Sequence, residues 1–227
     1  SEFAVNLDAA LKKQFAVCTQ TPACANAFGD PWSSLHTLRD TLRAKPVEVA
    51  YRDPDAGMAK SMRLDEFSLA LLARIYAYVP ETSALLPLAI AQALRGDYAP
   101  LASQVQMLNG ELEGLSDNAM RLSVLCSEDA DLLTPRPQDA DTLLGTRMEE
   151  AFKAQGAIWP HGTRAADFHA PLVSAKPVLI LSGEFDPVTP PRHAGQIAKT
   201  LSNARVLVAK GQGHSDMGRG CFPKLVA

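Results

Sequence analysis

The chain has 227 residues, enough for one or two domains, and its hydrophobic (47%) and charged (21%) fractions are ordinary for a globular protein. A net charge of −3 gives no basic surface for nucleic acid or for an anionic membrane. No apolar run approaches the roughly 20 residues that span a bilayer. We therefore expect neither nucleic acid nor a membrane among its partners.

The first two-thirds of the sequence is predicted to be mostly helical. Asn6 is expected to cap a first helix whose apolar stripe covers residues 7–15. Asp30-Pro31 opens a second helix, because the N–H that proline lacks would be unpaired in the first turn anyway. A hairpin with strands at 47–51 and 62–64 follows, and Asp65 can cap the next helix. Further helices are predicted at 82–95, 98–112 and 142–155, with a short apolar run at 122–126.

The pattern changes near residue 160. Residues 178–182 form an apolar run without alternation, which is typical of a strand buried on both faces of a parallel sheet. A helix at 189–201, a second strand at 205–209 and the start of a helix near the C-terminus complete a predicted βαβ unit. Two strands alone make a poor sheet, so the rest of the sheet is expected to come from elsewhere.

Two residues with catalytic chemistry follow the two predicted strands. Asp186 comes just after the first strand and His214 just after the second. Catalytic groups collect at the carboxyl ends of strands in open α/β sheets. A carboxylate there can orient an imidazole and leave its other nitrogen free to take a proton, and Gly213 would let the chain turn tightly before the histidine. The alternative is an aspartate that caps the next helix and an unrelated histidine.

These segments resemble the acid and base segments of α/β-hydrolases, in which the triad order is Ser, Asp, His. The resemblance is closest to the tripeptidyl-aminopeptidase and prolyl-aminopeptidase branch, with Gly-x-x-Asp-Pro-Val-Thr-Pro at 183–190 and Gly-x-Gly-His at 211–214. Weaker landmarks resemble the helical lid that these enzymes insert before the acid strand: Cys18 to Cys24, Pro80-Glu81-Thr82, Gly96-Asp97-Tyr98, Cys126-x-Glu128-Asp129 and Trp159-Pro160.

The resemblance implies an incomplete α/β-hydrolase fold, in which a mostly helical lid is followed by the last βαβ unit of the parallel sheet. The lid would cover residues 1–165 and the C-terminal part of the core residues 166–227. No serine has glycine at both −2 and +2, so the nucleophile elbow is expected upstream of Ser1, together with the oxyanion hole. Relatives often have a cysteine near the Trp-Pro element, where this chain has Gly156, so Cys126 lacks that partner.

The implied parent enzyme is a serine exopeptidase that releases residues from peptides with a free N-terminus. An esterase or another acyl hydrolase is the alternative within the fold, because fold and triad do not fix the substrate. A non-catalytic, lid-like binding module is the alternative from another class. Expected partners are the peptide, the missing N-terminal part of the core and a second copy of the chain. No cofactor is expected, and no metal, because Asp186 and His214 lack a third ligand.

Glu128 and Asp129 are weaker candidates, which could bind the α-ammonium of a peptide substrate. The alternative is a solvated cluster at a helix end. His161 and His169 are interpreted as loop residues and His193 as an exposed residue in the first turn of a helix. Ser215 adjoins the proposed base too closely to be its nucleophile.

The four cysteines bear on the compartment. Cys18 and Cys24 are either two buried thiols or a small disulfide loop, and a disulfide would imply an oxidising compartment. We predict the disulfide, and with it a periplasmic or secreted protein, with a cytoplasmic one as the alternative. The pairing of Cys126 and Cys221 is left open.

Overall fold

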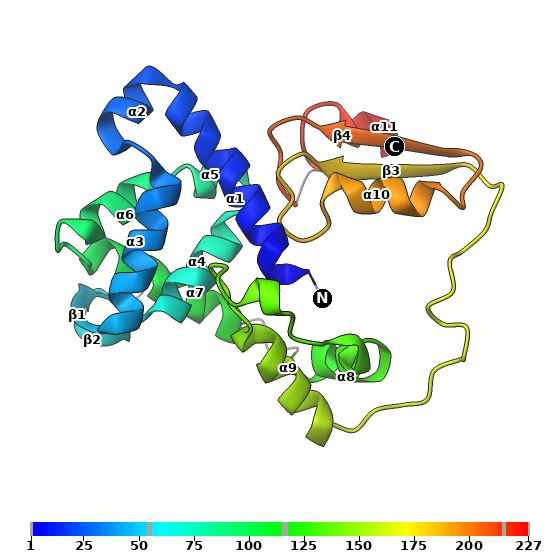
Figure 1. Cartoon of the computed structure of the whole chain (residues 1–227), viewed down its shortest axis with the longest axis horizontal. Helices are drawn as coiled ribbons and strands as arrows, with labels where there is room; N and C mark the ends of the chain where they lie inside the picture. The colour runs from blue at the N-terminus through cyan, green and yellow to red at the C-terminus, as the bar shows by residue number, and fades with distance from the viewer. Residues whose placement is uncertain (1, 54–55, 115–117, 215–216, 227) are drawn as a thin grey trace.

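The computed structural model describes residues 2–53, 56–114, 118–214 and 217–226, with only the backbone for 111–114 and 118. A helical body and a small parallel sheet lie side by side and are joined by a long extended segment before residue 178 (Figure 1). The chain is therefore of the α/β class. Among the described residues, no helix combines the length and the apolar character that crossing a membrane requires.

The described residues of the helical body share an apolar core. Its largest fully buried side chains are mostly leucines, and they include Leu7, Leu38, Leu72 and Leu101 from four different helices. The helices that contribute to this body are α1 (Phe3–Gln20), α2 (Pro22–Phe28), α3 (Pro31–Ala44), α4 (Glu66–Tyr76), α5 (Pro80–Ser83), α6 (Leu86–Leu94) and α7 (Ala99–Gly114).

The helix start predicted at Asp30-Pro31 and the cap predicted at Asp65 are confirmed. A carboxylate oxygen of Asp30 accepts from the Trp32 amide at 3.0 Å, and one of Asp65 accepts from the Ser68 amide at 2.9 Å. Each bond satisfies an amide that has no partner inside its own helix. The predicted hairpin is also confirmed, with β1 (Val47–Arg52) antiparallel to β2 (Ala59–Leu64). Part of its predicted turn, residues 54–55, lies outside the described residues.

Two helix predictions were wrong in detail. Helix α1 begins at Phe3, and Asn6 does not cap it: the Asn6 side chain is buried, donates to the Val188 carbonyl at 3.3 Å and accepts from Arg192. The Asn6 side chain therefore makes long-range hydrogen bonds in place of the local capping bond that the sequence predicted. The single helix expected at 82–95 is divided into α5 and α6, since Pro87 fits the first turn of a helix and not its interior.

The helical segment that follows packs as a pair, α8 (Asn118–Glu128) against α9 (Arg147–Ile158), with short 3₁₀ turns at Ala130–Leu132 and Pro137–Asp139. Helix α9 begins later than the predicted residue 142. The hydroxyl oxygen of Thr142 accepts from the Gly145 amide at 3.1 Å, which closes a turn in place of a helix start.

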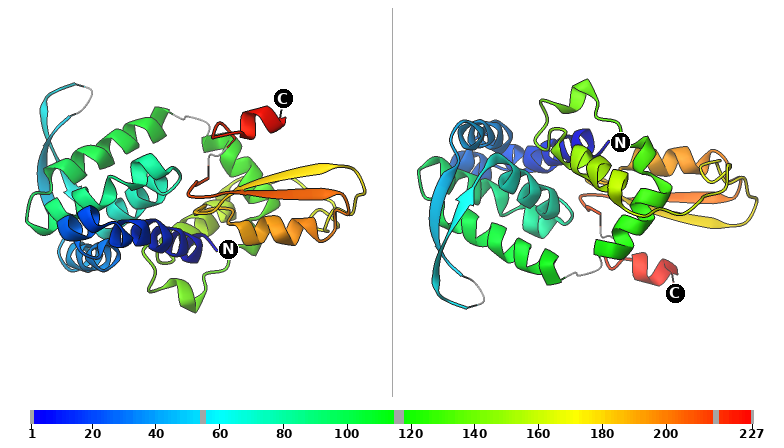
Figure 2. Two further views of the ribbon diagram at one scale, coloured as in Figure 1. Left: turned by 90° about the horizontal axis from the view of Figure 1, so that it is seen from above. Right: turned by 90° about the horizontal axis from the view of Figure 1, so that it is seen from below.

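The βαβ prediction is confirmed. Strands β3 (Val178–Gly183) and β4 (Ala204–Ala209) are parallel, with Ile180 opposite Val206, and α10 (Pro191–Ala198) connects them. A last short helix, α11 (Phe222–Val226), lies near the C-terminus. Both views in Figure 2 show α10 running along the two strands.

The expectation that the first strand is buried on both faces was wrong. In this chain Leu179 is 40% exposed, and on β4 Leu207 is 37% and Val208 44% exposed. An apolar run shows that burial of the strand would be favourable, but it does not show which helices or strands cover its two faces. Among the described elements α10 is the helix that packs against the strands, and one helix of eight residues cannot cover both faces.

Candidate active site

The loops after the two parallel strands bring an aspartate and a histidine together. Asp186 follows the end of β3 at Gly183, and His214 follows the end of β4 at Ala209. Because the strands are parallel neighbours, both loops leave the same edge of the sheet. The Nδ1 atom of His214 lies 2.9 Å from Oδ2 of Asp186, so the two side chains meet as the sequence predicts.

The Asp186 carboxylate is buried and surrounded by donors. Its Oδ1 accepts from the amides of Val188 (2.7 Å) and Thr189 (2.8 Å), and its Oδ2 accepts from the Thr189 hydroxyl (2.9 Å) as well as from His214. Burial by itself raises the pKa of Asp186, but the hydrogen bonds from His214, Thr189 and Val188 outweigh it and hold the pKa below its ordinary value. The group is therefore a fixed negative charge at neutral pH.

Two glycines let the loops approach this closely. A Cβ atom on Gly183 would lie 1.8 Å from the carbonyl oxygen of Gly213, and a Cβ on Gly213 would lie 2.1 Å from the carbonyl oxygen of Tyr78. A side chain at 183 would push the two loops apart, and a side chain at 213 would push the histidine loop away from the Tyr78 backbone. Gly213 was expected to provide a tight turn, yet the positive φ of this loop is at Gly211 (φ +68°), and Gly213 instead permits contact with the helical body.

The segment after helix α4 fixes the position of the histidine. The His214 amide donates to the Tyr78 carbonyl at 2.7 Å, and the two rings meet edge to face with centroids 5.1 Å apart. The His214 side chain is 34% exposed. Because Nδ1 of His214 contacts Asp186, Nε2 is the ring nitrogen that can exchange a proton with another group. The sequence carried no signal for Tyr78, since the contact joins segments more than 130 residues apart.

Residues 141–227 match an α/β-hydrolase family model described as TAP-like protein. Over these residues the chain is similar to the C-terminal part of TAP-like α/β-hydrolases. This segment contains both parallel strands, α10 and the Asp186–His214 pair. No curated protein matches the chain.

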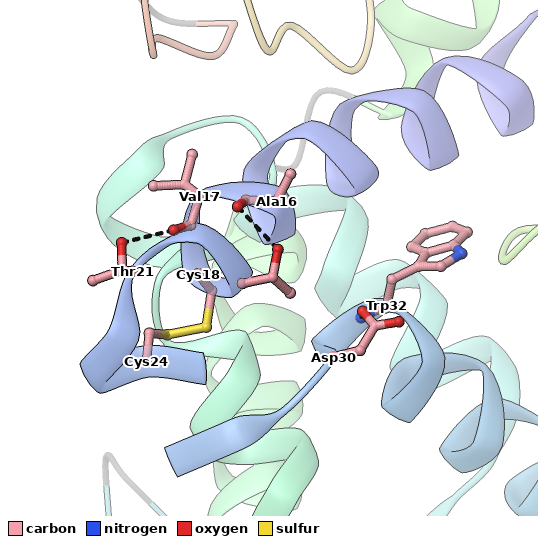
Figure 3. The surroundings of a disulfide bond; sticks show 8 residues. Ala16, Val17, Cys18, Thr21, Cys24, Asp30 and Trp32 are labelled. Atoms are coloured by element: carbon pink, nitrogen blue, oxygen red, sulfur yellow. Dashed lines mark hydrogen bonds between the residues drawn. A yellow bond between two sulfur atoms is a disulfide. The ribbon is translucent and has the colours of Figure 1, made fainter. Parts of the chain in front are cut away.

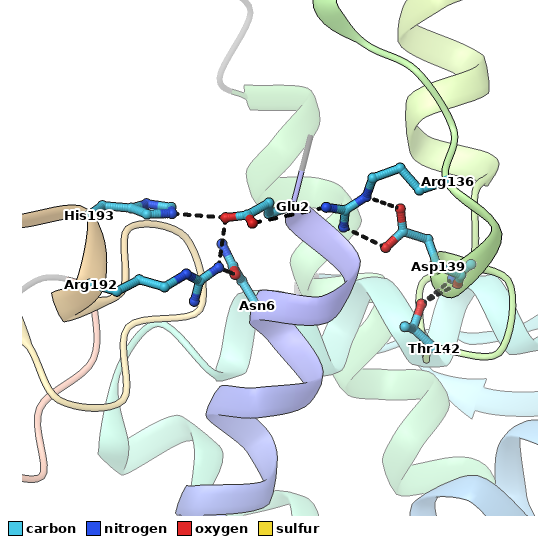
Figure 4. Close-up of polar contacts among 8 residues, drawn as sticks. Glu2, Asn6, Arg136, Asp139, Thr142, Arg192 and His193 are labelled. Carbon is cyan, nitrogen blue, oxygen red and sulfur yellow. Dashed lines mark hydrogen bonds and ion pairs between the residues drawn. The ribbon is translucent and has the colours of Figure 1, made fainter. Parts of the chain in front are cut away.

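A polar cluster joins helix α1 to the TAP-like segment close to the acid loop (Figure 4). Glu2 contacts Arg192 (2.7 Å) and His193 (2.9 Å) at the start of α10, and lies 4.0 Å from Arg136. Hydrogen bonds from His193 and then Arg192 lower the pKa of Glu2. Together with the bond from Asn6 to the Val188 carbonyl, these contacts hold the segment after Asp186 against α1.

The other predicted candidates lie elsewhere. Glu128 and Asp129 are at the end of α8, where the Glu128 carbonyl accepts from Arg164 (2.6 Å) and lies 2.9 Å from His169 Nε2. Within the described part of the chain, no hydrogen bond or ion pair connects either residue to Asp186 or His214. His161 is exposed and contacts the Trp159 carbonyl, whereas His193 is half-buried against Glu2. Ser215 lies outside the described residues.

The predicted disulfide is confirmed: Cys18 near the end of α1 is bonded to Cys24 in α2 (Figure 3). Such a bond is compatible with an extracellular location. Cys126 is buried with a free thiol, and the exposed Cys221 is also free. A Cβ atom built on Gly156 would lie 3.6 Å from the Cys126 sulfur, so this is where a partner cysteine would fit.

Proposed function

We propose that this chain is part of a serine hydrolase in which Asp186 orients His214 as the general base. The observation that carries the proposal is the 2.9 Å contact between Asp186 and His214 at the ends of adjacent parallel strands, inside a segment that is TAP-like. The low pKa of Asp186 supports this role, because a charged carboxylate both fixes the tautomer of the histidine and stabilises its imidazolium.

The reaction proceeds by acyl transfer. A serine that precedes Ser1 attacks the scissile carbonyl, and Nε2 of His214 takes the hydroxyl proton. His214 then gives that proton to the leaving amine as the carbon–nitrogen bond breaks, which leaves an acyl-enzyme. Water, deprotonated by the same nitrogen, attacks the ester, and the proton returns to the serine oxygen when the acid leaves. Asp186 stays ionised throughout.

The rest of the chain has two roles in this scheme, a lid over the site and part of the core that carries the site. We assign residues 1–165 to a lid that restricts access to peptides with a free N-terminus, and residues 166–227 to the last part of an incomplete α/β-hydrolase core. Glu128 and Asp129 then serve as receptors for the peptide ammonium group. The exposed apolar side chains of β3 and β4 favour pairing with the missing N-terminal part of the core, or with a second copy. The disulfide supports a periplasmic or secreted protein.

The test has two stages. The chain as given should turn over neither aminoacyl nitroanilides nor aminoacyl nitrophenyl esters, and the coding sequence upstream of Ser1 should contain a Gly-x-Ser-x-Gly elbow. In the extended protein, Asp186→Asn should lower kcat by about 10⁴-fold and His214→Ala by about 10⁶-fold. His161→Ala is the matched control, because that exposed histidine contacts the Trp159 carbonyl and is given no role in this scheme.

Each result separates the candidates. Turnover by the chain as given that disappears in His214→Ala would contradict a missing nucleophile. Unchanged turnover in the extended His214→Ala variant would overturn the role of the histidine. A start codon immediately before Ser1 would favour the non-catalytic module, and hydrolysis of esters without any action on aminoacyl amides would favour an esterase.

A further inference from the structure

A cavity of about 460 Å³ opens between the helical body and the two strand-end loops. Its walls come from the end of α1, the start of α2, the α5–α6 region and the loops that carry the candidate pair. This volume falls in the usual range of small-molecule sites, about 300–1,000 Å³. The cavity is therefore large enough for a side chain of leucine or phenylalanine size with part of its backbone.

The lining of this cavity is apolar. Phe15, Val17, Pro80, Ala84 and Phe185 contribute to it, and the Cys18–Cys24 disulfide forms part of the wall. Val17 is 53% exposed although it is a large apolar residue. None of the described residues that line the cavity is charged. A charged group placed here would lose water without gaining a partner, which is costly.

The polar side chains of the lining do not change this character. The hydroxyl of Thr21 donates to the Val17 carbonyl (2.8 Å), that of Ser83 to the Pro80 carbonyl (3.0 Å), and the amide nitrogen of Gln14 to the Ala77 carbonyl (3.0 Å). Their donors are therefore occupied by the protein backbone. The Gln14 amide oxygen is buried and has no hydrogen-bond partner among the described residues.

The cavity borders both loops that carry the candidate pair, through Phe185 and Gly211. Phe185 directly precedes Asp186, and its amide donates to the Gln212 carbonyl at 2.8 Å, two residues before His214. Gly211, on the same wall, donates its amide to Glu184 at 2.9 Å. The two loops that carry the acid and the base are thus tied together where they form the cavity wall.

We propose that this cavity binds an apolar side chain of the substrate, of leucine or phenylalanine size, next to the bond that is cleaved. The proposal rests on the hydrolase function proposed above and adds the substrate class to it. Burying such a side chain supplies binding energy and holds the substrate beside His214, whereas a glycine leaves the cavity empty. The enzyme therefore prefers large apolar residues over small or charged ones.

Binding to the chain as it stands tests the cavity without any need for catalysis. N-acetyl amides of leucine, phenylalanine, glycine and aspartate differ only in the side chain and are titrated while the Val17 methyl signals are followed by NMR. The leucine and phenylalanine amides should shift these signals and bind at least about tenfold more tightly than the other two. Equal binding of all four amides, shifts confined to other regions, or no binding at all would overturn the proposal.

A pair of variants locates the site. Ala84→Trp fills the cavity from an exposed position, and Leu94→Trp adds the same side chain at a residue that is 40% exposed and outside the lining. Ala84→Trp should weaken binding of the leucine amide by about tenfold or more, and Leu94→Trp should leave it unchanged. Equal effects of the two variants would contradict the assignment.

The extended enzyme separates this proposal from the proposed function. There Ala84→Trp should raise KM for substrates with a large apolar residue and leave alanine substrates unchanged, and an equal loss for both substrates would overturn the cavity assignment. If His214→Ala abolishes turnover but the amides do not bind, the cavity proposal fails and the hydrolase function stands. If the amides bind but His214→Ala has no effect on turnover, the hydrolase function fails.

Discussion

Replacing Gly156 by cysteine should create a second disulfide, to Cys126. Helices α8 and α9 pack together, and a Cβ on residue 156 lies 3.6 Å from the Cys126 sulfur, so a new thiol can reach it after a small shift. The same Cβ lies 3.0 Å from the Ala130 Cβ, and the 3₁₀ turn that begins there must yield by a few tenths of an ångström.

The expected gain follows from the loop that the bond closes. About 30 residues separate the two positions, and the chain-closure model gives about 3.6 kcal/mol for a loop of this length. Crowding at Ala130 offsets about 1–2 kcal/mol of this. A net gain of about 2 kcal/mol corresponds to a rise in Tm of about 4–8 °C for a chain of this size.

The assay compares oxidised Gly156→Cys with the oxidised parent protein by thermal unfolding. A comparison with and without reductant would also open the Cys18–Cys24 bond, so it is avoided. Thiol titration of the unfolded oxidised variant should find only Cys221 reactive, and Gly156→Ser controls for the added atoms. Free thiols at both 126 and 156 after oxidation would refute the packing of α8 against α9 described above. A bond without any rise in Tm over the serine variant would refute the expected gain in stability.

Three further outcomes are expected. Burial raises the pKa of Asp8 to about 6 against the hydrogen bond from the Leu143 amide, so its stabilising contribution is complete below pH 4 and is lost as the pH rises through 6. Asp8→Asn should therefore raise the free energy of unfolding by about 1–2 kcal/mol at pH 8 but not at pH 4, and an equal gain at both pH values in urea unfolding would contradict this. Cys24→Ser should lower the free energy of unfolding by about 2 kcal/mol, and an unchanged denaturation midpoint would argue against the disulfide. The chain should self-associate in light scattering through its exposed strands, and Leu207→Lys should reduce this. A monomeric parent with its strand at 178–182 protected from amide exchange would show that no partner is needed.

The features that the sequence predicted correctly depend on nearby residues. The helix start at Asp30-Pro31 and the cap at Asp65 depend only on residues one to three positions further along, so their local patterns were sufficient. The proximity of Asp186 and His214 was predictable for a related reason, because two successive parallel strands must release their loops at one edge. The local strand patterns at 178–182 and 205–209 were therefore enough to predict a contact between residues that are 28 positions apart.

The features that were missed depend on contacts between distant segments. Asn6 has the side chain of a cap, but Val188 and Arg192 lie close enough to use it. Gly213 approaches Tyr78, and the cavity lies beside Phe185, because the helical body packs against the strand-end loops. The hydrophobic periodicity of either segment does not predict this packing. The exposure of β4 likewise depends on which elements cover it.

The link between Tyr78 and His214 has a consequence for how this protein can evolve. The hydrogen bond joins two backbone groups, so no change of side chain at position 78 can remove it. Point mutations there can alter the ring that packs on the imidazole and still leave the loop anchored. An insertion or deletion between α4 and α5 would move the carbonyl itself and carry the histidine away from its aspartate. We therefore expect natural variants to change residues in this connection freely while keeping its length constant.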